Sequence, residues 1–280
     1  MPDKQISTNR SGLTFTDRVA LITGGSRGIG AGCARVFVDA GAKVMICARQ
    51  REDGERLATE LSEIGPGECT FQCCDVSQHD SICAVIDFTV ERFGQLDCLV
   101  NNAGYHPPVK RIEQFTIDEL QDVWQTNFIS QFVACRHALP HLRVTKGSII
   151  NMSSLVGEIG QEGATTYCAT KGAINAFTKA LAIEEASHGV RVNAILPGNI
   201  VSDSRIRFRQ SVPNAAEVDR WIDANQHNGR SGTNEEVGQL CLFLASEVAS
   251  YITGTLQNIS AGAELGYGVK HPTTFIGPNP

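Results

Sequence analysis

The stretch TGGSRGIG, residues 23–30, is a glycine-rich turn between two segments of different periodicity. The apolar run 18–23 before it predicts a buried strand, and the pattern 29–39 after it predicts a helix. Glycines at 24, 28 and 30 permit a tight turn and let a pyrophosphate approach backbone N–H groups at the positive end of the helix. Structural turns also use glycine clusters, but the position between a strand and a helix favours dinucleotide binding.

Short apolar runs rich in β-branched residues alternate with longer helical patterns from residue 18 to about residue 260. Near-continuous apolar character predicts strands covered on both faces, and the alternation predicts crossover helices between parallel strands. We therefore expect an α/β fold with a single doubly wound Rossmann-type domain, whose seven-stranded parallel sheet has helices on both faces. The strand candidates are 18–23, 42–48, 69–74, 98–100, 147–152, 191–196 and 255–259, and examples of the helical patterns are 29–39, 81–92, 118–139 and 166–185.

Three segments fall outside this alternation. Residues 1–17 form a polar N-terminal arm ahead of the catalytic domain 18–260, and residues 261–280 form a Gly/Pro-rich C-terminal tail. The insertion 199–230 follows a strand at the sheet edge where ligands bind in open α/β folds, so we expect it to be a substrate lid. The apolar residues Leu265 and Tyr267 suggest the hypothesis that the tail covers the site of a neighbouring subunit.

The composition excludes several classes of partner. Hydrophobic residues make up 42% of the 280 residues and charged residues 19%, which is sufficient for a large core. The formal net charge of −6 gives no electrostatic reason to bind nucleic acid or an anionic membrane. The N-terminal segment lacks the apolar core of a secretory signal, and no apolar run reaches the roughly 18 residues of a membrane span. We expect a cytoplasmic protein.

The ten cysteines include no Cys-x-x-Cys pair and accompany no histidine cluster at zinc spacing, so we expect no metal site. We interpret them as small buried apolar residues in a reducing compartment. His137 and His141 have helical spacing for a metal pair, but Pro140 predicts a helix end between them and a third ligand is not apparent. Both histidines are expected on the surface.

The end of the second strand candidate bears on the choice of cofactor. Proteins of this fold that bind NAD place an acidic residue there to hold the ribose 2′-hydroxyl. Here the strand ends Cys47-Ala48-Arg49, with no carboxylate. Arg27 in the glycine turn and Arg49 can instead flank a 2′-phosphate, which favours NADP(H). The alternative is that both arginines are ordinary surface residues.

Tyr167 and Lys171 are four residues apart in a helical pattern, so their side chains lie on one face and can meet a common ligand. A phenol has a pKa near 10, and lowering it toward 7 takes roughly 4 kcal/mol, to which a nearby ammonium and an oxidised nicotinamide ring both contribute. Ser154 follows the strand candidate 147–152 and offers a hydroxyl that can polarise the substrate oxygen. A Tyr-x-x-x-Lys pair alone is common on helix surfaces.

Two further polar features precede these residues. Asn101-Asn102-Ala103-Gly104 ends the fourth strand candidate, where small residues allow a cofactor to approach closely. Asn127 is a polar residue inside an otherwise apolar helical pattern. Its structural alternative is a buried capping or kink residue.

Together these residues resemble the classical short-chain dehydrogenase/reductase family over roughly residues 17–265. The motifs appear in family order and spacing: TGxxxGxG at 23–30, Asp75, NNAG at 101–104, Asn127, Ser154, Tyr167-x-x-x-Lys171 and Pro197-Gly198. The resemblance implies an NAD(P)-dependent oxidoreductase that acts on CH–OH groups of a small-molecule substrate and forms a homo-oligomer, often a tetramer.

The resemblance also implies individual roles. Asp75 would bind the adenine edge, Asn127 would anchor a water in a proton relay through Lys171, and Ile200 and Ser202 would meet the nicotinamide amide. The family usually has threonine where this chain has Ser202, which keeps the hydroxyl. The expected catalytic residues are Asn127, Ser154, Tyr167 and Lys171, and the expected cofactor-binding residues are Gly24, Ser26, Arg27, Gly28, Ile29, Gly30, Arg49, Asp75, Val76, Asn102, Ala103, Gly104, Tyr167, Lys171, Pro197, Gly198, Ile200 and Ser202.

Within the family, the stretches NNAGYHPP, SSLVGEIGQ, LPGNI and GAELGYG look like the type-14 17β-hydroxysteroid dehydrogenase group, whose members oxidise secondary alcohols of steroids or of sugars such as L-fucose. Ala48 and Arg49 depart from the acidic NAD pattern of that group. Tyr105 and Gln161 are the candidates for substrate contact, whereas Arg205, Arg207 and Arg209 are expected to form a solvated face.

Three functional hypotheses follow from the sequence. The first is an NADP(H)-dependent oxidoreductase that interconverts a secondary alcohol and a ketone by hydride transfer, with Tyr167 as general acid or base. The second is an NAD-dependent dehydrogenase of a steroid or an L-fucose-like sugar. The third, a non-catalytic dinucleotide-sensing protein, conflicts with the intact set of Ser154, Tyr167 and Lys171.

Overall fold

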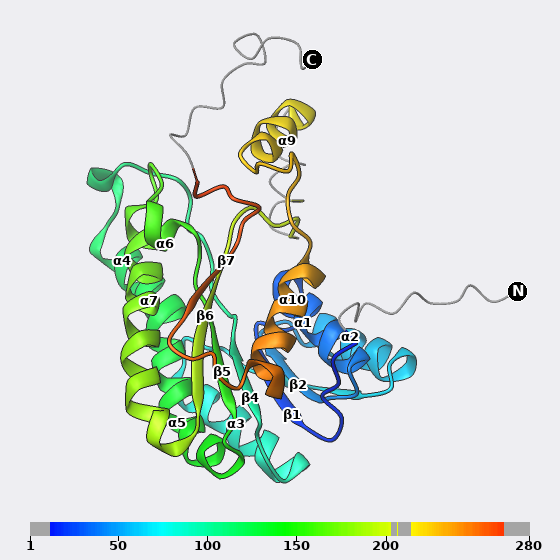
Figure 1. Ribbon diagram of the computed structural model, residues 1–280. Helices are drawn as coiled ribbons and strands as arrows, with labels where there is room; N and C mark the ends of the chain where they lie inside the picture. Colours follow the sequence, from blue (N-terminus) through cyan, green and yellow to red (C-terminus); the bar gives the residue numbers. More distant parts are fainter. Residues whose placement is uncertain (1–11, 203–205, 207–213, 266–280) are drawn as a thin grey trace, which may run out of the picture.

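The computed structural model describes residues 12–202, 206 and 214–265. Seven parallel strands form one sheet in the order β3-β2-β1-β4-β5-β6-β7 (Figure 1). The predicted α/β doubly wound architecture is confirmed, and each predicted strand is found within about one residue of its expected ends. The strands are β1 (Val19–Thr23), β2 (Lys43–Ala48), β3 (Glu68–Cys73), β4 (Cys98–Asn101), β5 (Ser148–Met152), β6 (Arg191–Pro197) and β7 (Leu256–Ile259).

Two helical layers cover the sheet, one on each face (Figure 1). One layer contains α1 (Gly28–Asp39), α2 (Arg51–Ile64) and α10 (Asn234–Ala245), and the other contains α3 (His79–Phe93), α5 (Ser130–Thr145) and α7 (Thr165–Glu185). The remaining helical segments are η1 (Ile112–Gln114), α4 (Ile117–Trp124), η2 (Gln125–Ile129), α6 (Val156–Ile159), η3 (Ala186–His188), α9 (Ala215–Ala224) and η4 (Glu247–Ala249).

Alternate residues of the central strands enter separate hydrophobic clusters. On β1, Ala20 and Ile22 pack toward α1 and α10, whereas Val19 and Leu21 pack toward α3 and α5. All four side chains are fully buried, as expected for a strand whose successive side chains point to opposite faces of a covered sheet. This double burial explains why the strands are near-continuous apolar runs in the sequence.

The sequence predicts one continuous helix over residues 118–139, but the structure divides this range into three segments. Between α4 and α5, residues of η2 make a π turn, and α5 continues to Thr145. The prediction that a helix ends at Pro140 is therefore wrong. Pro140 is exposed, so water can satisfy the carbonyl group of Arg136 that the proline ring leaves without a helical donor.

The interpretation of all the cysteines as buried is also partly wrong. Seven are buried, but Cys73 is exposed and Cys83 and Cys168 are half-buried; all ten are free thiols. His137 and His141, both expected at the surface, are half-buried, and Nε2 of His137 lies 2.7 Å from the Asp87 carboxylate.

Several predicted features fall wholly or partly outside the described residues. These are the first part of the N-terminal arm, the tail after Leu265, and Arg205, Arg207 and Arg209 of the predicted lid. The described part of the predicted lid segment includes α9, which lies beyond one end of the sheet and apart from the two helical layers (Figure 1). Among the described helices, none combines the length and apolar character needed to cross a bilayer.

Candidate active site

The glycine turn after β1 is held against the end of β4. The Asn102 side-chain amide donates hydrogen bonds to the carbonyl oxygens of Thr23 (2.9 Å) and Gly24 (3.1 Å). The Thr23 hydroxyl accepts from the backbone N–H of Ala103 at 3.0 Å. Gly24 has φ +64°, and a Cβ there would lie 3.0 Å from Cα of Ala103. The NNAG segment therefore fixes the shape of the glycine turn.

The beginning of α1 has the properties of an anion site. Arg27 at its N-cap has extended backbone and makes no side-chain cap, and the first turn contains no acidic residue. Gly28 has φ +54°, and a Cβ there would meet only Cβ of Ser202, at 3.8 Å. The first turn of α1 itself therefore places no carboxylate at the positive end of the helix, which fits the diphosphate of a dinucleotide.

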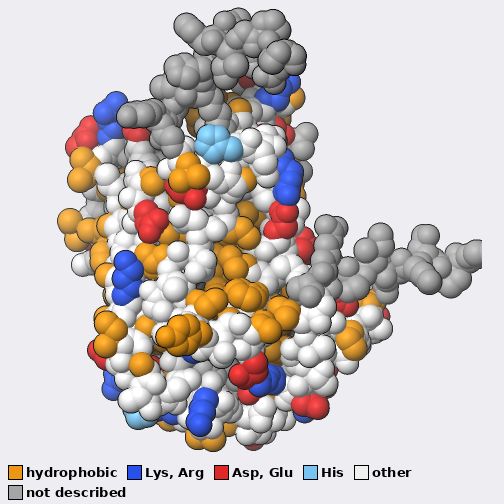
Figure 2. Space-filling model, in the orientation of Figure 1, with side chains coloured by type: hydrophobic (Ala, Val, Ile, Leu, Met, Phe, Trp, Pro, Cys, Tyr) orange, Lys and Arg blue, Asp and Glu red, His pale blue; other side chains and the backbone are white. Residues whose placement is uncertain are grey.

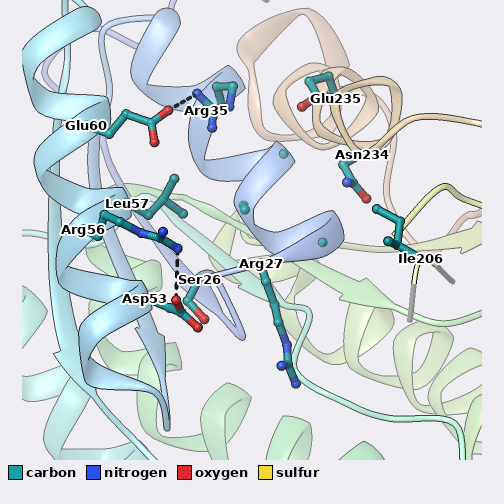
Figure 3. A pocket seen from close by; sticks show the side chains of 13 residues that line it. Ser26, Arg27, Arg35, Asp53, Arg56, Leu57, Glu60, Ile206, Asn234 and Glu235 are labelled. Atoms are coloured by element: carbon teal, nitrogen blue, oxygen red, sulfur yellow. Dashed lines mark hydrogen bonds and ion pairs between the residues drawn. The ribbon is translucent and has the colours of Figure 1, made fainter. Parts of the chain in front are cut away.

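Beside this turn, a cleft of about 650 Å³ lies between α1, α2 and the start of α10 (Figure 3). Ser26, Arg27 and Gly28 line one part of it. Two ion pairs lie on its other walls, Arg56 with Asp53 at 3.0 Å and Arg35 with Glu60 at 2.8 Å. In Figure 3 the Arg27 side chain extends away from both pairs.

Arg49 and Asp75 follow the ends of the neighbouring strands β2 and β3. The backbone N–H and the hydroxyl of Ser77 donate to Oδ1 of Asp75 at 3.0 and 2.8 Å. These hydrogen bonds, and to a lesser extent the positive charge of Arg49, lower the pKa of the Asp75 carboxyl group. Arg49 is exposed. Val76, next to Asp75, packs against the cluster formed with α3 and α5.

Tyr167 and Lys171 project from the first part of α7 toward the end of β5. Nζ of Lys171 donates to the carbonyl oxygen of Met152 at 2.8 Å and lies 5.5 Å from the centre of the Tyr167 ring. Lys171 is only 4% exposed, and this desolvation lowers its pKa to about 7. The predicted common face of the helix is confirmed, with the ammonium group directed to a backbone carbonyl.

Desolvation raises the pKa of Tyr167 to about 12, while its hydrogen bond with the Ser154 side chain opposes the rise. Burial thus penalises the phenolate of Tyr167 and the ammonium of Lys171 alike. A hydrogen bond also joins the Ser154 hydroxyl to the backbone N–H of Val156 at 3.4 Å. Ser154 and Tyr167 are thus brought together as the sequence predicted.

Asn127 lies in the π turn η2 and is completely buried. Its Oδ1 accepts from the backbone N–H of Tyr105, and its Nδ2 donates to the carbonyl oxygen of the same residue, both at 2.9 Å. A Cβ on Gly104 would lie 3.0 Å from Oδ1 of Asn127 and 4.0 Å from Nζ of Lys171. Asn127 therefore lies next to Lys171, and Gly104 leaves room beside both.

The segment after β6 closes the site from the side of β7. Pro197 accepts a backbone hydrogen bond from Leu155 at 3.0 Å, and the Gly198 N–H donates to Ile259 at 3.0 Å. Ile200 is buried and forms an isolated β-bridge with Gly232, which leaves Ser202 opposite Gly28. These contacts connect the predicted nicotinamide side with the phosphate loop.

The two substrate candidates lie in different settings. Tyr105 is 42% exposed beside the Asn127 amide that binds its backbone, whereas Gln161 is exposed in the loop between α6 and α7. His106, which follows Tyr105 after the NNAG turn, could also face a substrate, and its ring lies 4.4 Å from that of Tyr167. No sequence pattern indicated the Met152 carbonyl that binds Lys171, since any residue supplies such a group.

Comparison with known proteins agrees with this arrangement. A model of the enoyl-(acyl carrier protein) reductase family matches residues 24–264. The chain is 44% identical to an L-fucose dehydrogenase of Bos taurus, covering 92% of this chain and 94% of that protein. It is 36% identical to the 3-oxoacyl-acyl-carrier-protein reductase FabG of Chlamydia pneumoniae, over 89% of this chain and 98% of the relative.

A solved structure shows the same fold. The crystal structure of Cj0485 dehydrogenase superposes with a TM-score of 0.82 and 28% sequence identity, covering 92% of this chain and 96% of the other. The similarity thus extends over the sheet, both helical layers and the candidate site.

Proposed function

This chain belongs to the short-chain dehydrogenase/reductase family, and we propose that it is an NADP(H)-dependent oxidoreductase that interconverts a secondary alcohol and a ketone. That it is an oxidoreductase acting on CH–OH groups follows from the family. The single observation that carries the proposed mechanism is the convergence of Ser154, Tyr167, Lys171 and Asn127 at the end of β5.

In this mechanism Tyr167 moves the proton at its phenol oxygen, as acid toward a ketone and as base toward an alcohol. The Ser154 hydroxyl, which shares a hydrogen bond with Tyr167, orients the substrate oxygen and stabilises its developing negative charge. The nicotinamide cofactor supplies the hydride acceptor or donor. Because a positive charge near the phenol favours the phenolate, protonated Lys171 assists Tyr167 as a base.

Lys171 also has a proposed part in moving the proton away from Tyr167. Its pKa of about 7 lets it change protonation state near neutral pH, which suits a relay group. Asn127, fixed by two hydrogen bonds to Tyr105, would hold the next member of that relay, a water molecule.

The proposed preference for NADP(H) depends on charge at the ends of β1 and β2. Arg27 lines the cleft beside the phosphate loop, and Arg49 acts electrostatically on Asp75, so both cations lie near the predicted adenosine side. A carboxylate at position 48 or 49, which would hold a 2′-hydroxyl and repel a 2′-phosphate, is absent from the sequence.

The second candidate is an NAD-dependent dehydrogenase of an L-fucose-like sugar. It is favoured by the 43–45% identity with mammalian L-fucose dehydrogenases, over at least 92% of this chain. The sequence resemblance to the type-14 17β-hydroxysteroid dehydrogenase group also favours a secondary alcohol of a sugar or a steroid as substrate. We propose a cyclic secondary alcohol, with L-fucose tested first.

A panel of sugars, steroids and small ketones, followed through reduced-nicotinamide absorbance with each cofactor, tests both candidates. We expect turnover with NADP(H) to exceed turnover with NAD(H) on the same substrate. Higher turnover with NAD(H) on L-fucose would support the second candidate. Absence of turnover across the panel, with the cofactor bound, would contradict both.

The assembly and location are further proposals. β7 is an edge strand, and it follows the exposed apolar residues Val248 and Tyr251. Figure 2 shows hydrophobic side chains gathered in the middle of the molecular face along which β7 runs. We infer a homo-oligomer, a tetramer by family resemblance, in the cytoplasm, and gel filtration with light scattering checks the assembly. The lid 199–230 and the tail are proposed to complete the substrate pocket.

A further inference from the structure

The π turn η2 carries a second polar side chain besides Asn127. Gln125 is the first residue of the turn, and its Nε2 lies 2.9 Å from the carbonyl oxygen of Ser77 and 2.9 Å from Nε2 of His79. A primary amide has two N–H donors, so one Gln125 side chain can donate both to Ser77 and to His79 in the tautomer whose Nε2 carries no proton. Because residues two apart in a helical turn project from different sides, Gln125 and Asn127 make contacts in separate directions.

The contacts of Gln125 reach the loop that holds Asp75. Ser77 accepts from Gln125 through its carbonyl oxygen, while its N–H and hydroxyl donate to Oδ1 of Asp75. His79 is the first residue of α3. Ser77, Gln78, His79, Asp80 and Gln125 line a cleft of about 430 Å³. A continuous series of contacts thus runs from Asp75 through Ser77 to Gln125.

On its other side the turn determines the position of Asn127. The Asn127 side chain is buried and bound to both backbone groups of Tyr105, next to Lys171. A π turn interrupts the regular helical hydrogen-bond pattern, and such turns are rare and frequently lie at functional sites. Gln125 ties the first residue of this turn to the loop after β3.

We propose that Gln125 is a positioning residue that couples the adenine-binding loop to the proton relay. The inference rests on the proposed roles of Asp75 and Asn127. Gln125 holds the Ser77 loop and the π turn at a fixed separation, so the loop keeps the shape that presents Asp75 and the turn keeps Asn127 beside Lys171. Without the Gln125 amide, the Ser77 loop no longer holds Asp75 in place and the π turn no longer holds Asn127 in place.

The test compares Gln125→Leu with Gln121→Leu, a matched control on the exposed side of α4 about one turn earlier. The dissociation constant of 5′-AMP, measured by calorimetry, reports the adenine end alone. The turnover number at saturating cofactor reports the relay end. For Gln125→Leu we expect the AMP dissociation constant to rise about 5-fold and turnover to fall about 5-fold, the size of effect of one lost hydrogen bond at each end. Both values stay within about 2-fold of the native protein in the control.

If Gln125 couples the two ends of the site, Gln125→Leu must change both the AMP dissociation constant and the turnover number. A loss of AMP affinity with unchanged turnover, or the reverse, would mean that Gln125 serves one end only and would overturn the proposal. So would equal behaviour of the two leucine variants. If instead the native protein binds neither 5′-AMP nor NADP(H), or gives no turnover, the proposed function itself fails.

Discussion

The two ends of the candidate site are built in different ways. The phosphate-loop end, at β1 to β3, is made mainly of backbone and glycine within one short stretch, 23–30. The proton-relay end, at β4 to β6, is made of side chains that are far apart in sequence, from Asn127 to Lys171. Asn127 and Lys171 are buried there.

The difference shows where each end is vulnerable. At the phosphate loop the limits are steric, because an added Cβ at Gly24 or Gly30 meets neighbouring atoms at 3.0 Å or less. At the relay the limits are electrostatic. Burial raises the pKa of Tyr167 and lowers that of Lys171, so both side chains favour their neutral forms. Substitutions should therefore act on affinity and folding at the first end, and on turnover and pH dependence at the second.

The largest effect is expected at the relay. Tyr167→Phe removes the proton-carrying oxygen and should lower turnover about 10³-fold, with the cofactor dissociation constant changed less than about 3-fold. Tyr251→Phe, which changes a fully exposed tyrosine, is the control. Steady-state kinetics and cofactor titration measure the two quantities. Near-native turnover in Tyr167→Phe would refute the proposed mechanism.

A steric change at the loop should come next. In Gly30→Ala the new Cβ would lie 2.3 Å from the carbonyl oxygen of Gly24 and 2.6 Å from Nδ2 of Asn102, so the loop must shift. We expect a loss of about 2–3 kcal/mol in unfolding free energy and at least a 10-fold weaker affinity for the cofactor. Gly94→Ala adds a Cβ with no atom within 4 Å but at φ +82°, where alanine is strained, so it controls for destabilisation away from the loop. Equal cofactor affinities in the two variants would contradict the steric account.

Burial of Lys171 at the relay should lower the free energy of unfolding near neutral pH. Its pKa in the folded protein, about 7, is below the ordinary 10.5, so between these pH values the unfolded chain binds more protons and stability rises with pH. Lys171→Met should therefore raise the unfolding free energy near pH 7 by about 1–3 kcal/mol. This is less than the full shift implies, because the hydrogen bond to Met152 is lost.

This gain should shrink as pH approaches 10.5, and activity should be lost in the same variant. Denaturant unfolding at several pH values measures the stability, with Lys179→Met on the exposed side of α7 as control. A stability difference that does not change with pH would contradict the assigned cause.

The smallest effect is expected from the exposed cation of the phosphate end. Arg49→Asp should change the ratio of NADP to NAD affinities by about 10-fold in favour of NAD, because it replaces a cation near the 2′-position with a carboxylate. Arg51→Asp, in the exposed pair with Glu55 on α2, is the control. Titration with both cofactors measures the ratio. An unchanged ratio would identify Arg49 as an ordinary surface residue.

The sequence predicted the phosphate end in more detail than the relay end. The turn at 23–30 and the Tyr167–Lys171 face are local patterns, and the structure reproduces both. The π turn around Asn127 escaped prediction because helical periodicity does not distinguish one widened turn from a regular helix. The contact between the rings of His106 and Tyr167 was not predicted, because it depends on how two distant segments pack.

By itself, then, the sequence determined the parallel α/β sheet, the glycine turn and the residues available for acid–base chemistry, since these follow from periodicity, local geometry and residue type. The tertiary structure alone decided how those residues behave. Packing of α5 and α7 against the sheet buries Lys171 against the Met152 carbonyl and changes its pKa. It also brings Gln125 to Ser77 across 48 positions of sequence, a contact that no local pattern encodes.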